Sequence, residues 1–213
     1  ALDTSNQLII AETGFGTGLN FLAVLDLIEK KQSRCRIDYI SFEGYPLDAD
    51  LAFEARSSFR SVEHHSKALK QNWPPRWKCV HHRLFLDGQV HLHLHYGPAL
   101  QAMRELEFAS DIWFLDGFSP AKNIDLWSKD ISREIARLSA PTARLASFTV
   151  ASQVKDALQT AGFQIEKQPG FGRKREMLVA MHTSHKKPAT LFAAPDLSAG
   201  PDLSTGPDLS TGP

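Results

Sequence analysis

The chain has 213 residues, of which 42% are hydrophobic, and its 24 basic and 24 acidic residues leave no net charge when histidine is neutral. This length and composition fit one α/β domain with a buried core, and no apolar run is long enough to cross a bilayer as a helix. Any contact with nucleic acid must therefore come from a local basic patch. The two cysteines, Cys35 and Cys79, form no disulfide framework, so we expect a reduced, cytoplasmic protein without membrane contact.

The segment from Leu8 to Leu19 has the pattern of a strand followed by a glycine turn and a helix. The run Leu8 to Ala11 is typical of a buried parallel strand, and residues 14–18 (GFGTG) form a glycine-rich loop. A helix is predicted from Leu19 to Lys30. Strand, glycine turn and helix are the nucleotide-binding end of a Rossmann-type unit. Glycine is needed there because the backbone turns sharply and a ligand approaches where a Cβ would clash.

The spacing of the glycines separates two classes of cofactor. The dinucleotide pattern G-x-G-x-x-G would place its third glycine at position 19, which is Leu19 here, and this disfavours a nicotinamide enzyme. Glycine falls instead at Gly18, which gives the pattern Glu-x-Gly-x-Gly-x-Gly starting at Glu12. That pattern resembles motif I of S-adenosylmethionine methyltransferases. The alternative is a turn in an α/β fold that binds no cofactor.

The second predicted strand, Ile37 to Phe42, ends at an acid, Glu43. An acid at this place in Rossmann-type folds binds the ribose hydroxyls of a nucleotide. The alternative is that Glu43 caps the next predicted helix, Leu47 to Phe59. Ribose contact is favoured because Gly44 follows and leaves room.

A further helix is predicted from Ser61 to Trp73, and two prolines separate Trp73 from Trp77. We expect the two tryptophans to form a hydrophobic clasp at a loop rather than a recognition surface. A hairpin follows, with strands Cys79 to Leu86 and Gln89 to Tyr96 around a type I′ turn at Asp87-Gly88.

The second hairpin strand places His91, His93 and His95 on one face. Histidines at i and i+2 can bind one metal ion, but a third ligand two residues further on is out of reach and no acid or cysteine is adjacent in sequence. We therefore expect solvated histidines on a polar strand face and no metal.

The strand Asp111 to Leu115 ends in Asp116, Gly117 and Phe118. A carboxylate at the carboxyl end of a strand, beside glycine and an aromatic ring, lies where open α/β sheets bind ligands. This loop resembles the Asp-Pro-Pro-Tyr loop of amino-methylating enzymes, in which the acid or a carbonyl holds the target amine. The alternative is a helix cap with a core phenylalanine.

The rest of the domain alternates helices and strands. The expected elements are the helices Asp125–Leu138 and Ser152–Ala161 and the strands Leu145–Thr149, Phe163–Lys167 and Glu176–His182. The last two strands are close in sequence, which predicts an antiparallel edge. The loop between them contains Phe171 among basic residues, which fits stacking on an unpaired base with phosphate contacts beside it; a solvated turn is the alternative.

Four motifs together resemble the methyltransferase half of the MnmC family, the tRNA wobble-uridine enzymes: residues 11–22, 41–47, 113–123 and 170–178. The resemblance covers about Leu8 to Met181. It implies a Rossmann-like S-adenosylmethionine methyltransferase fold, an α/β fold with a mostly parallel sheet and an antiparallel last strand, in residues 1–187. Family members usually have Gly-Asp where this chain has Gly97-Pro98, so the adenine would be held by backbone or other groups.

The resemblance also implies a reaction. S-adenosylmethionine donates a methyl group to the amine of 5-aminomethyl-2-thiouridine at the tRNA wobble position, without a metal ion. Bifunctional members prepare that amine with an FAD-dependent oxidase half, which these 213 residues do not include. The implied partners are the tRNA anticodon loop and such an oxidase. Two alternatives are a methyltransferase for another amine and a non-catalytic domain that binds cofactor or tRNA.

The implied site residues fall into three groups. Asp116 and Phe118 are the candidate catalytic residues. The candidate cofactor contacts are Glu12, Thr13, Gly14, Phe15, Gly16, Gly18, Asn20, Glu43 and Asp116. The candidate tRNA contacts are Lys122, Phe171, Arg173, Lys174 and Arg175.

The end of the chain has a different character. Residues 195–212 repeat the hexapeptide Pro-Asp-Leu-Ser-(Ala/Thr)-Gly three times. Each copy contains one leucine and no aromatic residue, so it cannot bury enough apolar surface to offset chain entropy. Residues 188–213 are therefore expected to be a disordered linker or tail.

Overall fold

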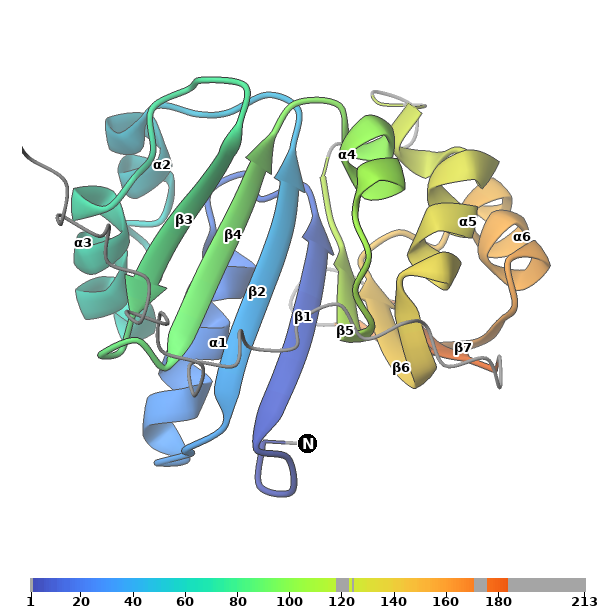
Figure 1. The fold of residues 1–213 in the computed structure, drawn as a ribbon, viewed down its shortest axis with the longest axis horizontal. Coiled ribbons are helices and arrows are strands. Elements are labelled where there is room, and N and C mark those ends of the chain that lie inside the picture. Colours follow the sequence, from blue (N-terminus) through green and yellow to red (C-terminus); the bar gives the residue numbers. More distant parts are fainter. Residues whose placement is uncertain (1, 118–122, 124, 171–175, 184–213) are drawn as a thin grey trace, which may run out of the picture.

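The computed structural model describes residues 2–117, 123, 125–170 and 176–183. Within them, eight strands form one sheet in the order β3-β4-β2-β1-β5-β6-β8-β7 (Figure 1). The strands are β1 (Gln7–Thr13), β2 (Arg36–Glu43), β3 (Val80–Phe85), β4 (Val90–Tyr96), β5 (Ser110–Leu115), β6 (Ser139–Ser147), β7 (Phe163–Pro169) and β8 (Glu176–His182). The repeat tail lies outside the described residues.

The five strands β4, β2, β1, β5 and β6 are parallel to one another. At one end β3 pairs antiparallel with β4, and at the other β8 runs antiparallel to both β6 and β7. The predicted mostly parallel sheet with an antiparallel last strand is therefore confirmed. The last strand is not the edge, however, because β8 is inserted between β6 and β7, and β7 occupies the edge.

Helices cover both faces of the sheet (Figure 1). They are α1 (Leu19–Lys30), α2 (Ala49–Ala55), η1 (Arg60–Val62), α3 (Glu63–Gln71), α4 (Ala99–Glu105), η2 (Asp125–Trp127), α5 (Lys129–Arg137) and α6 (Ser152–Thr160). Buried apolar residues of α1 and α3 form one core cluster with β1 to β4, and those of α4, α5 and α6 form another with β5, β6 and β8. Strands β1 and β2 are buried on both faces along most of their length, as strands between two helix layers are, whereas β4 alternates buried and partly buried residues. None of the described helices is both long and apolar enough to cross a membrane.

The predicted hairpin is present. Asp87 and Gly88 both have positive φ, 53° and 84°, and the Gln89 amide donates to the Leu86 carbonyl at 2.9 Å. These are the features of a type I′ turn, whose twist matches that of the flanking strands.

The expected tryptophan clasp is only half correct. The Trp73 ring packs on Phe15 with centroids 5.7 Å apart, and its indole nitrogen donates to the Leu47 carbonyl at 3.0 Å. Trp77, in contrast, is 72% exposed. Only the first tryptophan joins the core.

Several element boundaries differ from the sequence expectation. Helix α2 ends at Ala55 rather than at Phe59, and the side chain of the next residue, Arg56, is buried, with 2% exposed. Strand β6 begins at Ser139, six residues before the predicted start. Helix α4 was not predicted at all, since its seven residues are too few for a clear helical period.

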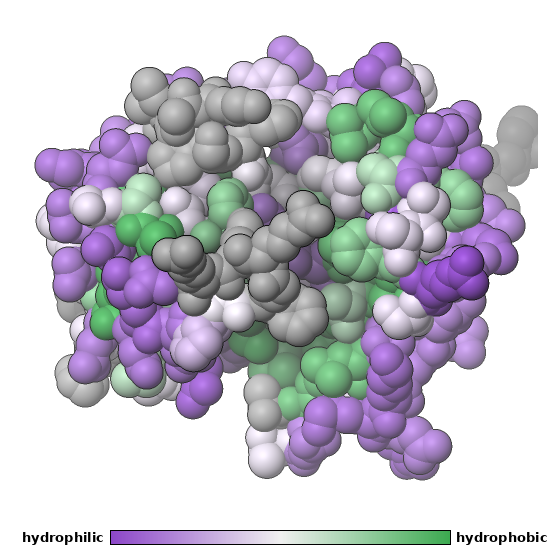
Figure 2. All heavy atoms as spheres, turned by 180° about the vertical axis from the view of Figure 1, so that it is seen from behind, coloured by the Kyte–Doolittle hydropathy of each residue, from purple (hydrophilic) through white to green (hydrophobic). Residues whose placement is uncertain are grey.

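Part of one sheet face remains near the surface. Ile112 and Phe114 of β5 are only partly buried at the margin of the first core cluster. Seen from behind, hydrophobic residues gather in the lower middle of the molecule between hydrophilic flanks (Figure 2).

We predict that Ser139→Ala lowers the free energy of unfolding by about 1–3 kcal/mol, the usual cost of leaving a buried donor unpaired. The Trp113 indole is fully buried and donates to Ser139 Oγ at 2.9 Å, and Ser139 Oγ donates to the Ile135 carbonyl. Urea unfolding measures the loss. The exposed Ser57→Ala serves as the control, and equal stability of the two variants would contradict the prediction.

Candidate active site

Three acids end neighbouring strands at the same edge of the sheet. Glu12 lies near the end of β1, Glu43 ends β2, and Asp116 follows β5 directly. Because β1 pairs in parallel with both β2 and β5, these strand ends lie side by side. The expected convergence of the three acids is therefore present.

The glycine loop fits closely against the loop after β5. Gly14 has φ +80°, and a Cβ built there would lie 2.6 Å from the Gly117 Cα and 2.8 Å from the Asp116 carbonyl oxygen. Gly117 also has a positive φ, +124°. Two glycines are thus required for the ends of β1 and β5 to approach this closely.

The other two loop glycines differ in their surroundings. A Cβ on Gly18, the N-cap of α1, would lie 2.9 Å from Leu69 and 3.0 Å from Phe15. A Cβ on Gly16 would meet no atom within 4 Å, although its φ is +52°. Gly16 therefore borders open space, as a ligand that approaches the backbone requires.

Glu43 supports the glycine loop. One carboxylate oxygen accepts a hydrogen bond from the Gly16 amide at 2.7 Å, and the other accepts one from the Tyr45 amide at 2.7 Å. The alternative role of Glu43 as a helix cap is excluded, because α2 begins at Ala49 and its N-cap is Asp48. Each oxygen keeps a second lone pair with which it can accept a hydrogen bond from a ligand hydroxyl.

One amide joins the other two acids. Asn20, in the first turn of α1, donates from Nδ2 to Glu12 Oε1 at 2.8 Å and to Asp116 Oδ2 at 3.2 Å. The second oxygen of Glu12 accepts a hydrogen bond from Ser41 Oγ at 2.8 Å. The Asn20 side chain therefore holds Glu12 and Asp116 at a fixed separation.

Glu12 is fully buried, and its protonation differs from that of an ordinary glutamate. Burial raises the pKa of Glu12 to about 8, and the Asp116 carboxylate adds to the rise, while the hydrogen bonds from Asn20 and Ser41 oppose it. Glu12 is then mostly neutral at pH 7. Asp116, by contrast, borders an open cavity.

That cavity has a volume of about 280 Å³ and lies at the carboxyl ends of β5 and β6. Its walls are largely apolar, and Asn20 and Asp116 supply polar side chains. The lining comes from Asn20, residues 114–116, residues 146–148, Gly170 and Met177. An apolar cavity with a carboxylate at its wall suits a small substrate group that carries an amine.

The remaining predicted cofactor contacts are structural in this arrangement. The Phe15 side chain is 3% exposed and packs on Phe21 and Trp73, so only its backbone can face a cofactor. Thr13 is 2% exposed and donates from Oγ1 to the Asp116 carbonyl at 3.2 Å, which helps to hold the two loops together.

Six predicted residues lie outside the described residues. They are the catalytic candidate Phe118 and the tRNA-contact candidates Lys122, Phe171, Arg173, Lys174 and Arg175. Their described neighbours, Gly117, Gly170 and Met177, lie beside or line the cavity.

Arg56 is a supporting residue that the sequence analysis missed. Its guanidinium donates to the Thr17 carbonyl of the glycine loop and, at 2.9 Å, to Ser66 Oγ. Burial lowers the pKa of Arg56 to about 10, so it keeps its charge at neutral pH. No local pattern distinguishes it from a surface arginine at a helix end, because Thr17 is 39 residues away.

Comparison with known proteins shows the family to which this chain belongs. A family model described as S-adenosyl-L-methionine-dependent methyltransferase matches residues 60–183, more than half of the chain. The chain belongs to this family. Its cofactor is therefore S-adenosyl-L-methionine.

Individual relatives agree with this family. The chain is 45% identical over 170 residues to the tRNA 5-methylaminomethyl-2-thiouridine biosynthesis bifunctional protein MnmC of Magnetococcus marinus, covering 79% of the chain and 26% of that protein. It is 43% identical over 182 residues to the protein of the same name from Marinobacter nauticus, covering 83% and 29%. The chain thus spans about a quarter of the length of these curated relatives.

A solved structure also matches. The crystal structure of MNMC2 from Aquifex aeolicus superposes with a TM-score of 0.65 at 26% identity, over 87% of this chain and 55% of that one. The sheet of this methyltransferase is therefore shared with a solved relative.

The described residues fit the family's cofactor. Gly16 offers open space beside a backbone turn, the Glu43 carboxylate stands next to it, and Asp116 borders the cavity. S-adenosylmethionine has ribose hydroxyls that hydrogen-bond to a carboxylate and a sulfonium charge that a nearby carboxylate stabilises. The donors and acceptors of the site are thus of the required kinds.

We predict that Glu12→Gln flattens the dependence of stability on pH. In the wild type the unfolded chain ionises Glu12 near 4.5 and the folded protein near 8. The contribution of this group is therefore complete below about pH 4.5 and is lost as the pH rises to 8. Relative to the variant, the wild type should lose on the order of a few kcal/mol of unfolding free energy from about pH 5 to 8.5. Urea unfolding at several pH values tests this, and parallel curves would contradict it.

We predict that alanine at Gly14 prevents folding, whereas alanine at Gly16 mainly weakens cofactor binding. Gly14→Ala should fail to reach the native fold, because its Cβ would meet backbone atoms 2.6 Å away. Gly16→Ala should fold with a loss of about 1–2 kcal/mol, the cost of a left-handed non-glycine residue. It should bind S-adenosylmethionine at least about tenfold more weakly, since the methyl group fills the approach to the backbone. Circular dichroism and calorimetry measure the two effects, and unchanged affinity of Gly16→Ala would contradict the second.

Proposed function

We propose that this methyltransferase transfers a methyl group from S-adenosylmethionine to the primary amine of 5-aminomethyl-2-thiouridine at the wobble position of tRNA. The product is 5-methylaminomethyl-2-thiouridine. The observation that carries the proposal is the cavity at the end of β5, where Asp116 borders an apolar space beside the glycine loop. The names of the relatives, which specify biosynthesis of this nucleoside in tRNA, support the choice of substrate.

The cofactor would be held at the strand ends. Glu43 would accept hydrogen bonds from the ribose hydroxyls while it keeps Gly16 in place, and Asn20 would orient Asp116 toward the cavity. The backbone around Gly97 and Pro98, where relatives usually have an acid, would border the adenine. When bound, S-adenosylmethionine supplies an activated methyl group whose departure from sulfur leaves a neutral thioether. Metal activation of the leaving group is then unnecessary.

Asp116 would act on the amine. Its carboxylate can accept a hydrogen bond from the substrate nitrogen and hold the nitrogen lone pair within about 3–3.5 Å of the methyl carbon. It can also take up the proton that the amine releases on methylation. The apolar walls from β5 and β6 favour the uncharged, nucleophilic amine, because burial disfavours an ammonium ion. Phe118 would exclude water from the same cavity.

The tRNA would be held by the aromatic and basic residues predicted from the sequence. Phe171 would stack on the flipped wobble base, and Arg173, Lys174, Arg175 and Lys122 would contact the phosphates of the anticodon loop. Residues 1–187 would form this domain and 188–213 a linker or tail. An FAD-dependent oxidase would supply the amine, in the cytoplasm where tRNA is modified.

A methyltransferase for another amine is the alternative to this proposal. Such an enzyme would methylate small amines but not under-modified tRNA.

We predict that Asp116→Asn lowers methyl transfer to under-modified tRNA by about 100-fold or more, the usual contribution of a positioned acid or base. Cofactor affinity should fall much less than turnover, because asparagine keeps the size of the side chain, although one of the two oxygens that accept from the Gly117 amide and from Asn20 is replaced by a donor. Mass analysis of wobble nucleosides measures turnover. Asp130→Asn on the exposed surface of α5 is the control. Undiminished turnover in Asp116→Asn would remove this role, and absence of methylation by the wild type would overturn the proposed substrate.

A further inference from the structure

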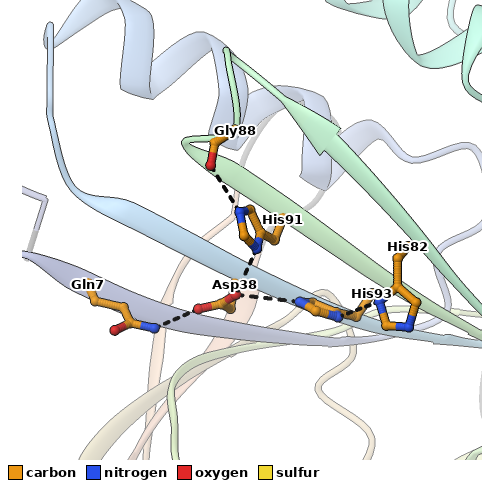
Figure 3. Close-up of polar contacts among 6 residues, drawn as sticks. All are labelled: Gln7, Asp38, His82, Gly88, His91 and His93. Atoms are coloured by element: carbon orange, nitrogen blue, oxygen red, sulfur yellow. Dashed lines mark hydrogen bonds and ion pairs between the residues drawn. The ribbon is translucent and has the colours of Figure 1, made fainter. Parts of the chain in front are cut away.

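A group of nitrogen and oxygen ligands lies on the sheet away from the strand ends that form the active site. His93 Nε2 is 3.4 Å and His91 Nδ1 is 3.7 Å from the same Asp38 oxygen, Oδ1. All three ligand atoms lie within 4.8 Å of one another. Figure 3 shows both imidazoles directed at the Asp38 carboxylate.

Strand register brings these residues together. Asp38 of β2 is the direct partner of His91 in β4, and His93 lies two residues further along the same face. Ile40 and Phe42, which share this face of β2, belong to the core cluster under α4 to α6. In Figure 1 none of the described helices lies over β3 and β4 on this side. The expectation of solvated histidines on a polar strand face holds only in part: His91, His93 and Asp38 are partly shielded, with 30%, 20% and 12% of their side chains exposed.

Each of the three side chains has an outer hydrogen-bond partner (Figure 3). Gln7 Nε2 donates to Asp38 Oδ2 at 2.6 Å, His91 Nε2 lies 3.0 Å from the Gly88 carbonyl, and His93 Nδ1 lies 2.9 Å from His82 Nδ1. Such partners fix the orientation of imidazole and carboxylate ligands in metal sites. The three potential metal ligands and a supporting partner for each are thus present.

The His91 contact determines its tautomer. A carbonyl oxygen only accepts hydrogen bonds, so His91 Nε2 carries the proton that it donates to Gly88. In the neutral ring the lone pair of Nδ1 then faces the Asp38 carboxylate oxygen. Two acceptors directed at each other repel, unless a proton on Nδ1 or a metal ion lies between them.

We propose that Asp38, His91 and His93 form a binding site for a divalent transition-metal ion of the Zn²⁺ type. Two imidazole nitrogens and one carboxylate oxygen suit Zn²⁺, whereas Mg²⁺ and Ca²⁺ prefer oxygen ligands alone. Bonds of about 2.0–2.1 Å in a tetrahedron place ligand atoms about 3.3–3.4 Å apart. The two separations to Asp38 Oδ1, 3.4 and 3.7 Å, are near this value. Water would complete the four ligands.

The position of the site indicates a structural effect rather than a catalytic one. Asp38 precedes Glu43 by five residues in β2, which is about 16 Å along a strand. A bound ion would join β2 to β4, and through the hairpin to the edge strand β3. It would therefore stabilise this end of the sheet without contact with the methyl-transfer site.

A second group provides an internal comparison. Glu29, His64 and His65 also bring three ligand atoms together, between α1 and α3. Glu29 and His64 are exposed, with 46% and 61% of their side chains accessible, and among the described residues neither has a supporting hydrogen bond from outside the group. We therefore assign the ion to the β2–β4 face and use His64 as a test of the alternative.

The test titrates the metal-free, untagged protein with Zn²⁺ against a chromogenic chelator. We predict one equivalent bound with a micromolar or tighter dissociation constant, and a rise in melting temperature on binding. His91→Gln and Asp38→Asn should each weaken binding at least about tenfold, and Gln7→Ala, which removes a support, about tenfold. His95→Gln, on the same strand face but outside the group, and His64→Gln should bind as the wild type does. Co²⁺ should give tetrahedral absorption bands in the wild type, His95→Gln and His64→Gln, but not in His91→Gln or Asp38→Asn.

Three results would overturn the proposal. They are no saturable Zn²⁺ binding by the wild type, equal loss in His95→Gln and His91→Gln, or loss in His64→Gln with retention in His91→Gln. Circular dichroism verifies that each variant is folded. If one of the two ligand variants does not fold, the other decides the outcome.

Discussion

The close approach of the β1 and β5 loops is the constraint on which the site depends. Gly14 leaves no room for a side chain against Gly117 and the Asp116 carbonyl, so the two strand ends meet through backbone atoms. Asn20 then spans the acids on both sides, with hydrogen bonds to Glu12 and Asp116. A carboxylate at the cavity wall is thereby held by one helix and two strands at once. Preorganisation of this kind is what a reaction with little covalent chemistry for the protein requires.

Buried polar side chains lie around the glycine loop and hold it in place. Glu12, fully buried, is neutral at pH 7 because burial raises its pKa to about 8, and Arg56 keeps its charge while it donates to the Thr17 carbonyl. Glu43 holds the Gly16 amide from the other side. The open space beside Gly16 is therefore bordered by a backbone that side chains from three elements hold in place. Such polar groups cost stability when they lose a partner, which ties the integrity of the loop to that of the fold.

The same sheet has two chemically different regions. Its carboxyl edge gathers the acids and the cavity, whereas the face of β2 and β4 gathers Asp38, His91 and His93. Both regions arise from parallel register, since neighbouring strands bring residues from distant parts of the chain into direct contact. β2 contributes to each: Glu43 at its end and Asp38 in its middle. An ion at the second region would affect the first only through the stability of this shared strand.

The spacing of the glycines after a buried strand, and acids at three strand ends, were enough to predict the cofactor class, the mostly parallel sheet and the convergence of Glu12, Glu43 and Asp116. These are local patterns, because a strand, a turn and a helix are each determined by neighbouring residues. The tertiary structure alone decided the rest. Phe15 packs inward against Trp73, Arg56 reaches Thr17 from the end of α2, and Asp38 lies beside histidines more than 50 residues further along the chain. Those partners are tens of residues apart, and only packing and strand register determine which of them meet.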